Sequence, residues 1–242
     1  MITSNHDQIE TFSGVLDSSV PANLLRKRLH MQRFSYPTAD YPFKEIIESW
    51  YGVELKDLHR FLGCFDVFDQ SKDQSTLAHK VFYANYNQRL KALYENFVRD
   101  FVAPIVGVEF YYQVIPSFRI GLPGNKFVGE YHRDSKYNHQ DYEINFNLGL
   151  SNYLGEASLR AEVTPGSEDF TLLECPYGEI FSFDHIDCMH GSDPNQTDQT
   201  MASFDFRLAL RELYFESNAG SVNMNSKFCP GGYFSSEIVR PG

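Results

Sequence analysis

From residue 108 onward the chain alternates short runs of β-branched and aromatic residues with turn-forming segments, and this pattern limits the possible folds more than any other feature. The turn-forming segments are Leu-Pro-Gly-Asn, Thr-Pro-Gly-Ser and Ser-Asp-Pro-Asn. Many short strands at such spacing are typical of a β-sandwich or barrel. We predict strands over residues 109–115, 118–122, 127–131, 144–150, 158–163, 180–183 and 201–210.

The first third of the chain has the spacing of helices instead. Pro21 and Pro42 each open an amphipathic stretch, and proline fits the first turn of a helix. A longer helix is predicted over residues 77–102, because apolar side chains recur on one face, and Pro104 is expected to end it. Helices followed by strands predict a mainly β fold with flanking helices: a double-stranded β-helix (jelly-roll, cupin-like) barrel under an N-terminal helical layer.

The composition is that of one folded domain, with 42% hydrophobic and 22% charged residues and no break along its 242 residues. We expect helical support over 1–107, the jelly-roll core over 108–216 and an irregular tail over 217–242. The net charge of −11 argues against nucleic acid or an anionic membrane as partner. The cysteines lack zinc-site or redox spacing, and neither a signal peptide nor a membrane-spanning run is evident, so we expect a cytoplasmic protein that acts on a small molecule.

Three residues are candidate ligands of one metal ion. Residues i and i+2 of a strand share a face, so His132 and Asp134 can bind the same ion, with His190 facing them across the barrel. Two imidazoles and a carboxylate leave three positions of an octahedron open, which suits Fe(II) with O2 and a bidentate keto acid. His185 and Asp187 form a second His-x-Asp, but His190 follows too closely to oppose them, so we interpret them as loop residues near the site.

A keto acid such as 2-oxoglutarate needs a cation for its distal carboxylate, and the planar fork of an arginine matches a carboxylate. By strand alternation Ser203 and Arg207 lie on one face of the predicted strand 201–210 and can both point inward. A structural ion pair of Arg207 with Asp205 or Glu162 explains the same residue equally well, and both interpretations stay open.

Several motifs between residues 113 and 208 resemble those of the phytanoyl-CoA dioxygenase-like Fe(II)/2-oxoglutarate oxygenases, in particular the branch that contains the streptomycin-biosynthesis hydroxylase. The motifs are Ile-Pro-Ser-Phe-Arg-Ile-Gly-Leu-Pro-Gly-Asn (115–125), Glu-Tyr-His-Arg-Asp-Ser-Lys-Tyr-Asn-His (130–139), Glu-Ile-Asn-Phe (143–146), Pro-Gly-Ser-Glu-Asp-Phe (165–170), Tyr-Gly-Glu (177–179), His-Gly (190–191) and Ser-Phe-Asp-Phe-Arg (203–207). The resemblance implies iron at the three ligands above, with 2-oxoglutarate and O2 as co-substrates. It also implies hydroxylation of an unactivated C–H bond of a small polar metabolite through Fe(IV)=O, as in natural-product biosynthesis.

The resemblance further points to Gln113 and Arg119 as polar groups near the keto acid. One position departs from the family: Met201 stands where an arginine is typical, although Ser203 is retained. Either Arg207, our first choice, or Arg119 must then bind the distal carboxylate, or the co-substrate differs.

The residues around the ligands indicate where a substrate enters. Halogenating relatives carry a small residue in place of the carboxylate, so the aspartate disfavours halogenation. The candidate entrance residues are Arg133, Lys136, Tyr137 and His139, with Tyr131 and Asn147 as further pocket candidates, although an exposed loop without a specific role explains the first four as well. Two other classes of function stay open: a cupin-like lyase or isomerase that uses a metal without 2-oxoglutarate, and a non-catalytic binding module on the same barrel.

Overall fold

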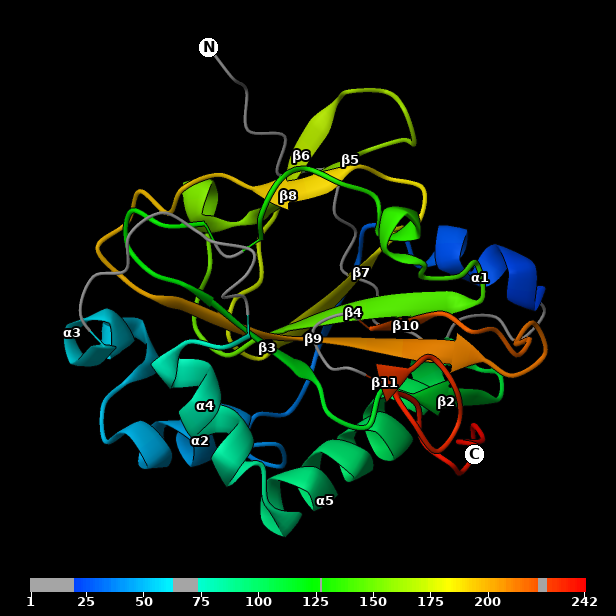
Figure 1. Ribbon diagram of the computed structural model, residues 1–242, viewed down its shortest axis with the longest axis horizontal. Coiled ribbons are helices and arrows are strands. Elements are labelled where there is room, and N and C mark those ends of the chain that lie inside the picture. Colours follow the sequence, from blue (N-terminus) through cyan, green and yellow to red (C-terminus); the bar gives the residue numbers. More distant parts are fainter. Residues whose placement is uncertain (1–19, 63–73, 127, 222–225) are drawn as a thin grey trace.

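Two antiparallel β-sheets face each other in the computed structural model, which describes residues 20–62, 74–126, 128–221 and 226–242 (Figure 1). The larger sheet has the order β1-β7-β4-β9-β2, with β3 also paired to β9, and the smaller has β6-β5-β8. Helices cover the outer face of the larger sheet, below it in Figure 1. The predicted class, a mainly β jelly roll with flanking helices, is confirmed, although the sheets do not join into a closed barrel within the described residues.

The strands are β1 (Gln32–Ser35), β2 (Phe110–Tyr112), β3 (Ser117–Gly121), β4 (Glu143–Gly149), β5 (Leu159–Glu162), β6 (Phe170–Leu173), β7 (Glu179–Phe183), β8 (His190–Ser192), β9 (Met201–Leu210), β10 (Gly220–Ser221) and β11 (Ser226–Lys227). The α-helices are α1 (Ala22–Arg28), α2 (Phe43–Tyr51), α3 (Leu58–Leu62), α4 (Leu77–Asn85), α5 (Gln88–Asn96) and α6 (Ala103–Val106). Short 3-10 helices are η2 (Leu55–Asp57), η5 (Asp134–Tyr137) and η6 (Gly155–Ala157), and η4 (Phe97–Val102) is a π-helical stretch. Within the described residues, no helix is both long and apolar enough to cross a membrane.

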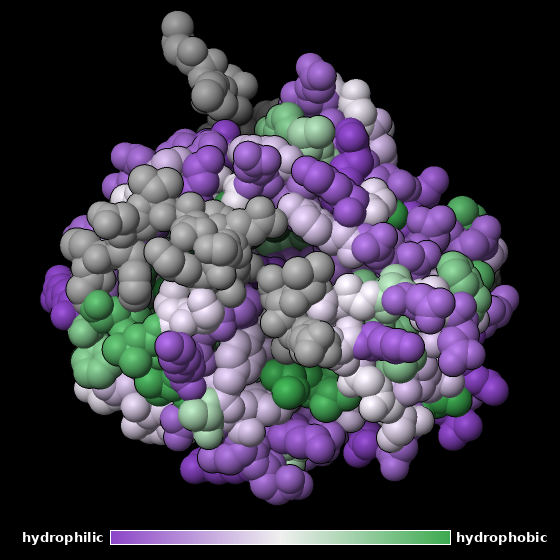
Figure 2. Space-filling model, viewed as in Figure 1, coloured by the Kyte–Doolittle hydropathy of each residue, from purple (hydrophilic) through white to green (hydrophobic). Residues whose placement is uncertain are grey.

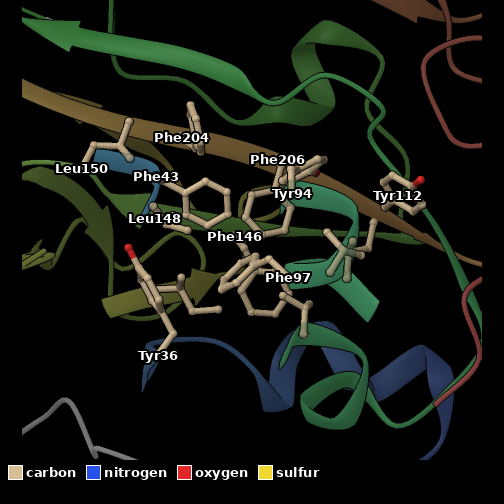
Figure 3. Packing of buried hydrophobic residues seen from close by; sticks show 14 of the residues in the cluster. Tyr36, Phe43, Tyr94, Phe97, Tyr112, Phe146, Leu148, Leu150, Phe204 and Phe206 are labelled. Atoms are coloured by element: carbon tan, nitrogen blue, oxygen red, sulfur yellow. The ribbon is translucent and has the colours of Figure 1, made fainter. Parts of the chain in front are cut away.

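Strand β9 separates the apolar core from the interior between the sheets. Its side chains alternate, so Phe204, Phe206 and Leu208 lie in the main hydrophobic core with the helices. Figure 3 shows this packing, in which the Phe204 ring meets Phe43 of α2 at 5.8 Å and the Phe206 ring stacks on Phe146 of β4 at 5.7 Å. The other face of β9 therefore places its polar side chains between the two sheets.

The long helix predicted over residues 77–102 is wrong as one element. The chain leaves the helix at Tyr86, and the Asn87 side chain accepts hydrogen bonds from the Arg89 and Leu90 N–H groups, which begins α5 anew. Pro104 lies in the first turn of α6 and does not end the helix. Proline is tolerated in a first turn, because the N–H that it lacks needs no helical partner there. The helices predicted after Pro21 and Pro42 are confirmed as α1 and α2.

Six of the predicted strands are confirmed, with ends shifted by a few residues, as β2, β3, β4, β5, β7 and β9. The strand predicted over 127–131 is wrong for its described residues 128–131, where pairing begins only with a single bridge at His132. The strands β1, β6 and β8 were not predicted. The described part of the tail is irregular apart from β10 and β11, and it packs on β2, where the Phe110 and Val239 backbones exchange two hydrogen bonds of 3.1 and 2.9 Å.

Candidate metal centre

The three predicted ligands lie together at the edge of the smaller sheet. His132 and His190 are direct antiparallel partners: each backbone N–H donates to the carbonyl of the other, at 2.9 and 2.8 Å. The expectation that they oppose each other across the barrel is therefore wrong. Asp134 begins η5 and does not continue a strand, and its N–H donates to the His185 carbonyl at 2.9 Å. Backbone hydrogen bonds thus fix all three residues.

The side chains converge through one atom each. Asp134 Oδ1 lies 3.2 Å from His132 Nε2 and 3.3 Å from His190 Nε2. The Nδ1 atoms of the two rings instead contact backbone carbonyls, of Glu130 at 2.7 Å and of Cys188 at 3.1 Å. A proton on Nδ1 leaves the lone pair on Nε2, so these contacts select the tautomer that binds a metal. All three ligand atoms lie within 4.8 Å of one another, close enough to hold one ion.

The second oxygen of Asp134 has a different partner. Arg207 Nη2 donates to Asp134 Oδ2 at 2.6 Å, and both side chains are buried. Burial alone would raise the pKa of Asp134, but the adjacent Arg207 guanidinium outweighs burial and holds that pKa well below its ordinary value. The carboxylate is therefore ionised at neutral pH, the form in which it binds a cation.

Arg207 has further contacts that decide part of the earlier alternative. Its Nη1 donates to the Tyr233 hydroxyl at 3.3 Å and lies 3.5 Å from Asp205 Oδ1. The proposed ion pair with Asp205 is confirmed, whereas the one with Glu162 is wrong, because Glu162 Oε2 accepts from Arg133 at 3.1 Å. The arginine is therefore fixed on several sides before any ligand arrives.

Gln113 is hydrogen-bonded to β9, the strand that carries Arg207. Its Oε1 accepts from the Arg207 backbone N–H at 3.1 Å, and its Nε2 donates to the Ile115 carbonyl at 2.7 Å and to Ser117 Oγ at 3.3 Å. These hydrogen bonds position β9, and the structure directs none of them toward the metal ligands.

Arg119 and Ser203 are direct cross-strand partners of β3 and β9, so their side chains share the interior face. Arg119 Nη2 lies 3.1 Å from Asp205 Oδ2, and its side chain is 19% exposed, compared with 7% for Arg207. Met201 lies in an apolar cluster with Phe181 and Phe183. The place of the missing arginine is therefore part of the apolar packing between the sheets.

The four predicted entrance residues have different surroundings. Lys136 is exposed, and the Tyr137 ring meets the His132 ring edge-on at 5.0 Å, so both lie beside the ligands. Arg133 donates to the Asp187 carbonyl at 2.7 Å. His139 turns inward instead, because Asn138 reverses the chain with a φ of 68° and the His139 ring contacts the buried Glu143 at 2.7 Å.

Two further pocket candidates are also placed. The Tyr131 ring packs edge-on against Phe170 at 5.2 Å, over Gly191. Asn147 faces the interior opposite Asp205 and is buried, and its Nδ2 has no hydrogen-bond partner within the described ranges. Asn145 lies on the same face of β4, opposite Arg207, and its Oδ1 likewise has no hydrogen-bond partner among the described residues. The interior thus offers polar atoms that a ligand can satisfy.

Two residues near the site were not predicted, and a third was predicted near it without a role. Tyr233 arrives from the tail, where no local pattern marks it. Glu143 stands four residues after His139, a spacing that could have indicated their contact. His185, predicted as a loop residue near the site, is fully buried with neither ring nitrogen hydrogen-bonded within the described residues, and burial holds its pKa well below the ordinary value.

Fold and triad together define a jelly-roll protein with a candidate two-histidine, one-carboxylate metal centre. Figure 2 shows the face viewed in Figure 1 as largely hydrophilic, with a hollow between the two sheets. No protein-family model matches the chain. The chain is similar to the streptomycin biosynthesis protein StrG of Streptomyces griseus, with 28% identity over 202 residues that cover 84% of this chain and 96% of that protein.

The chain was also compared with solved structures. EctD from S. alaskensis with bound Fe matches with a TM-score of 0.51 and 11% identity, over 86% of this chain and 83% of that one. The non-heme monooxygenase ThoJ matches with a TM-score of 0.47 and 14% identity, over 73% of this chain and 71% of that one. The likeness to EctD agrees with the jelly-roll architecture described above.

Proposed function

We propose that the protein is an Fe(II)- and 2-oxoglutarate-dependent oxygenase that hydroxylates a small polar metabolite. The observation that carries this proposal is the convergence of two imidazole Nε2 atoms and Asp134 Oδ1 at one point. This donor set is the one that non-haem Fe(II) oxygenases use, since it leaves room for a keto acid and O2. The similarity to StrG, a protein of streptomycin biosynthesis, supports a role in natural-product metabolism.

We assign the distal carboxylate of 2-oxoglutarate to Arg119 and Ser203, and not to Arg207, our first choice from the sequence. Arg119 and Ser203 lie side by side on the interior face of β3 and β9. Arg207 is bound to the candidate ligand Asp134 and is more deeply buried than Arg119, whose ion pair is with Asp205, which is not a candidate ligand. Arg119 of β3 thus lies two residues from Gly121, the β3 partner of Met201, which stands where the similar family typically has an arginine.

When bound, iron with O2 and the keto acid supplies the oxidant that attacks a C–H bond; the chain's residues position the reactants. His132 and His190 present their lone pairs because backbone carbonyls hold their Nδ1 protons. The polar atoms of Asn145 and Asn147 that have no partner among the described residues orient a polar ligand between the sheets. The apolar cluster around Met201 excludes water from one side of the interior.

Two measurements test this function. Anaerobic addition of Fe(II) and 2-oxoglutarate should give a visible metal-to-ligand charge-transfer band, and O2 should then yield succinate. His132→Ala should lose both signals, because one of three ligands is gone. His59→Ala is the matched control, since His59 lies on α3 with its ring bonded to Thr200. If the parent protein binds Fe(II) but gives neither band nor succinate, the proposal is wrong.

One observation favours a second candidate, a cupin-like metal enzyme that does not use 2-oxoglutarate. The family's arginine position is apolar here, and Arg207 is bound to Asp134. Such an enzyme would bind a divalent metal at the same three residues yet show no dependence on a keto acid. Metal binding without the charge-transfer band separates it from the oxygenase, and no metal binding at all would indicate a non-catalytic binding module.

A further inference from the structure

The two carboxylate oxygens of Asp134 face different partners. Oδ1 points to both imidazoles, at 3.2 and 3.3 Å, whereas Oδ2 is held by Arg207 at 2.6 Å. A short charge-assisted hydrogen bond of this kind is among the stronger ones in proteins, especially between buried groups. One oxygen is thus available to a metal and the other is occupied.

We propose that Arg207 is a positioning residue that keeps Asp134 a monodentate metal ligand, and that the C-terminal segment, residues 226–239, holds Arg207 in place through Tyr233. The proposal rests on the metal site proposed above. A carboxylate that binds through both oxygens occupies two positions of the metal. With Oδ2 held by the guanidinium, Asp134 takes one position, and three remain for the keto acid and O2.

Arg207 is itself fixed at both its backbone and its side chain. The side-chain Oε1 of Gln113 accepts from the Arg207 backbone N–H at 3.1 Å. The Tyr233 hydroxyl accepts from Arg207 Nη1 at 3.3 Å. A planar guanidinium can serve Tyr233 and Asp134 at once through different nitrogens, which a lysine ammonium on a flexible stem does poorly.

The C-terminal segment places Tyr233 by pairing with β2. The Val114 N–H donates to the Tyr233 carbonyl at 3.1 Å, and the Ser235 N–H donates to the Tyr112 carbonyl at 2.7 Å. The rings of Phe228, Tyr233 and Phe234 are buried in one cluster with Tyr142. Because backbone pairing and apolar burial both fix the segment, the hydroxyl reaches Arg207 without a cost of ordering a loose chain.

The test compares two keto acids on Co(II)-loaded protein, followed by the visible Co(II) absorption and not by turnover. 2-Oxoglutarate has a distal carboxylate, whereas 2-oxobutyrate lacks it. In Arg207→Met the freed Oδ2 should occupy a metal position, so both keto acids should bind about tenfold or more weakly, with Co(II) itself still bound. Arg207→Lys should recover part of this loss, because its ammonium reaches Asp134 but not Tyr233 as well.

Arg119→Gln is the converse variant, and it should weaken 2-oxoglutarate alone. Tyr233→Phe removes one hydroxyl and should weaken both keto acids by a smaller factor than Arg207→Met. Tyr142→Phe is its matched control: Tyr142 lies in the same cluster, and its hydroxyl has no hydrogen-bond partner within the described residues, so both keto acids should bind as in the parent.

Three results would count against these proposals in distinguishable ways. A loss confined to 2-oxoglutarate in Arg207→Met would make Arg207 the carboxylate anchor and overturn the inference. Unchanged binding of both keto acids in Arg207→Met and Tyr233→Phe would also overturn it. A parent protein that binds Co(II) but no keto acid would instead contradict the proposed function. Circular dichroism of each variant shows whether it is folded. If Arg207→Met does not fold, the conservative variant Tyr233→Phe still tests the proposal.

Discussion

Gly191, directly after the candidate ligand His190, makes a close steric contact with Tyr131. A Cβ at this residue would lie 2.9 Å from Cδ2 and Cγ of Tyr131 and 3.1 Å from its Cα. The segment before His132 therefore crosses β8 where only a glycine fits. This contact gives a physical reason for the His-Gly pair that the sequence contains.

Gly191→Ala should destabilise the protein by about 1–3 kcal/mol, because the added methyl group overpacks the contact with Tyr131. It should also weaken Co(II) binding, because the strain falls on the residue next to His190. Urea unfolding and a chelator competition assay measure the two effects. The double variant Tyr131→Ala/Gly191→Ala should recover part of both losses, and an unchanged unfolding midpoint in Gly191→Ala would contradict this account.

Glu162 has a folded-state pKa below its ordinary value. Burial opposes this shift, but hydrogen bonds from the Met189, Gly166 and Glu168 N–H groups and from Arg133 outweigh it. A carboxyl group whose pKa is lower when folded adds stability above its unfolded pKa and loses it as pH falls through the folded pKa. Glu162 thus ties the residue before His190 to the turn at 164–167 as long as it is ionised.

Glu162→Gln should therefore lower the urea midpoint at neutral pH, and the difference from the parent should shrink as the pH falls through the acidic range. Glu156→Gln is the control, because Glu156 is an exposed carboxylate beside the same sheet and should have little effect. A difference that stays constant down to acidic pH would show that ionisation of Glu162 does not matter.

At the scale of the elements, the aromatic contacts between the helices and β9 carry the core. Phe204→Ala should destabilise the protein by about 3–5 kcal/mol, since the fully buried ring packs against Phe43, Phe82 and Phe118. Phe215→Ala, at a ring that is 54% exposed, should change stability far less. Thermal or urea unfolding compares the two, and equal losses would mean that the core depends on other contacts.

The elements also show what the sequence could predict. Strong alternation along β9 and β4 and proline at the starts of α1 and α2 are local signals, so these elements were predicted. The break at Asn87 needs the side-chain cap to be recognised inside an otherwise apolar helical pattern. The pairing of His132 with His190 depends on contacts between distant segments. Residue type and order therefore identified three candidate ligands that the fold brings together, but not their arrangement.

The partners of Arg207 show the same limit. Strand alternation predicted that its side chain points inward, and this holds, since it reaches Asp134 between the sheets. Tyr233 lies in a tail rich in polar residues and glycine, and its contact with Arg207 follows only from the pairing of that tail with β2. Local patterns indicate which face a residue occupies, whereas tertiary packing decides what it meets there.

For the whole molecule, the three candidate ligands are held by backbone hydrogen bonds that do not require an ion. We expect the metal-free protein to keep its secondary structure, because metal binding adds to a site already assembled. Adding Co(II) at a hundredfold excess over its dissociation constant should stabilise the folded state by about 2.7 kcal/mol. Thermal unfolding with and without chelator tests this, and a loss of far-UV circular dichroism on chelation would contradict it.

The alternation along β9 has a consequence for how such proteins diversify. Its even-numbered residues belong to the main apolar core, whereas Ser203, Asp205 and Arg207 face the space between the sheets. Substitutions on the inner face can alter what is recognised while the outer face keeps the same partners. Inner positions that do not hold Asp134 are therefore where the proposed site can vary, with the scaffold preserved by the residues in between.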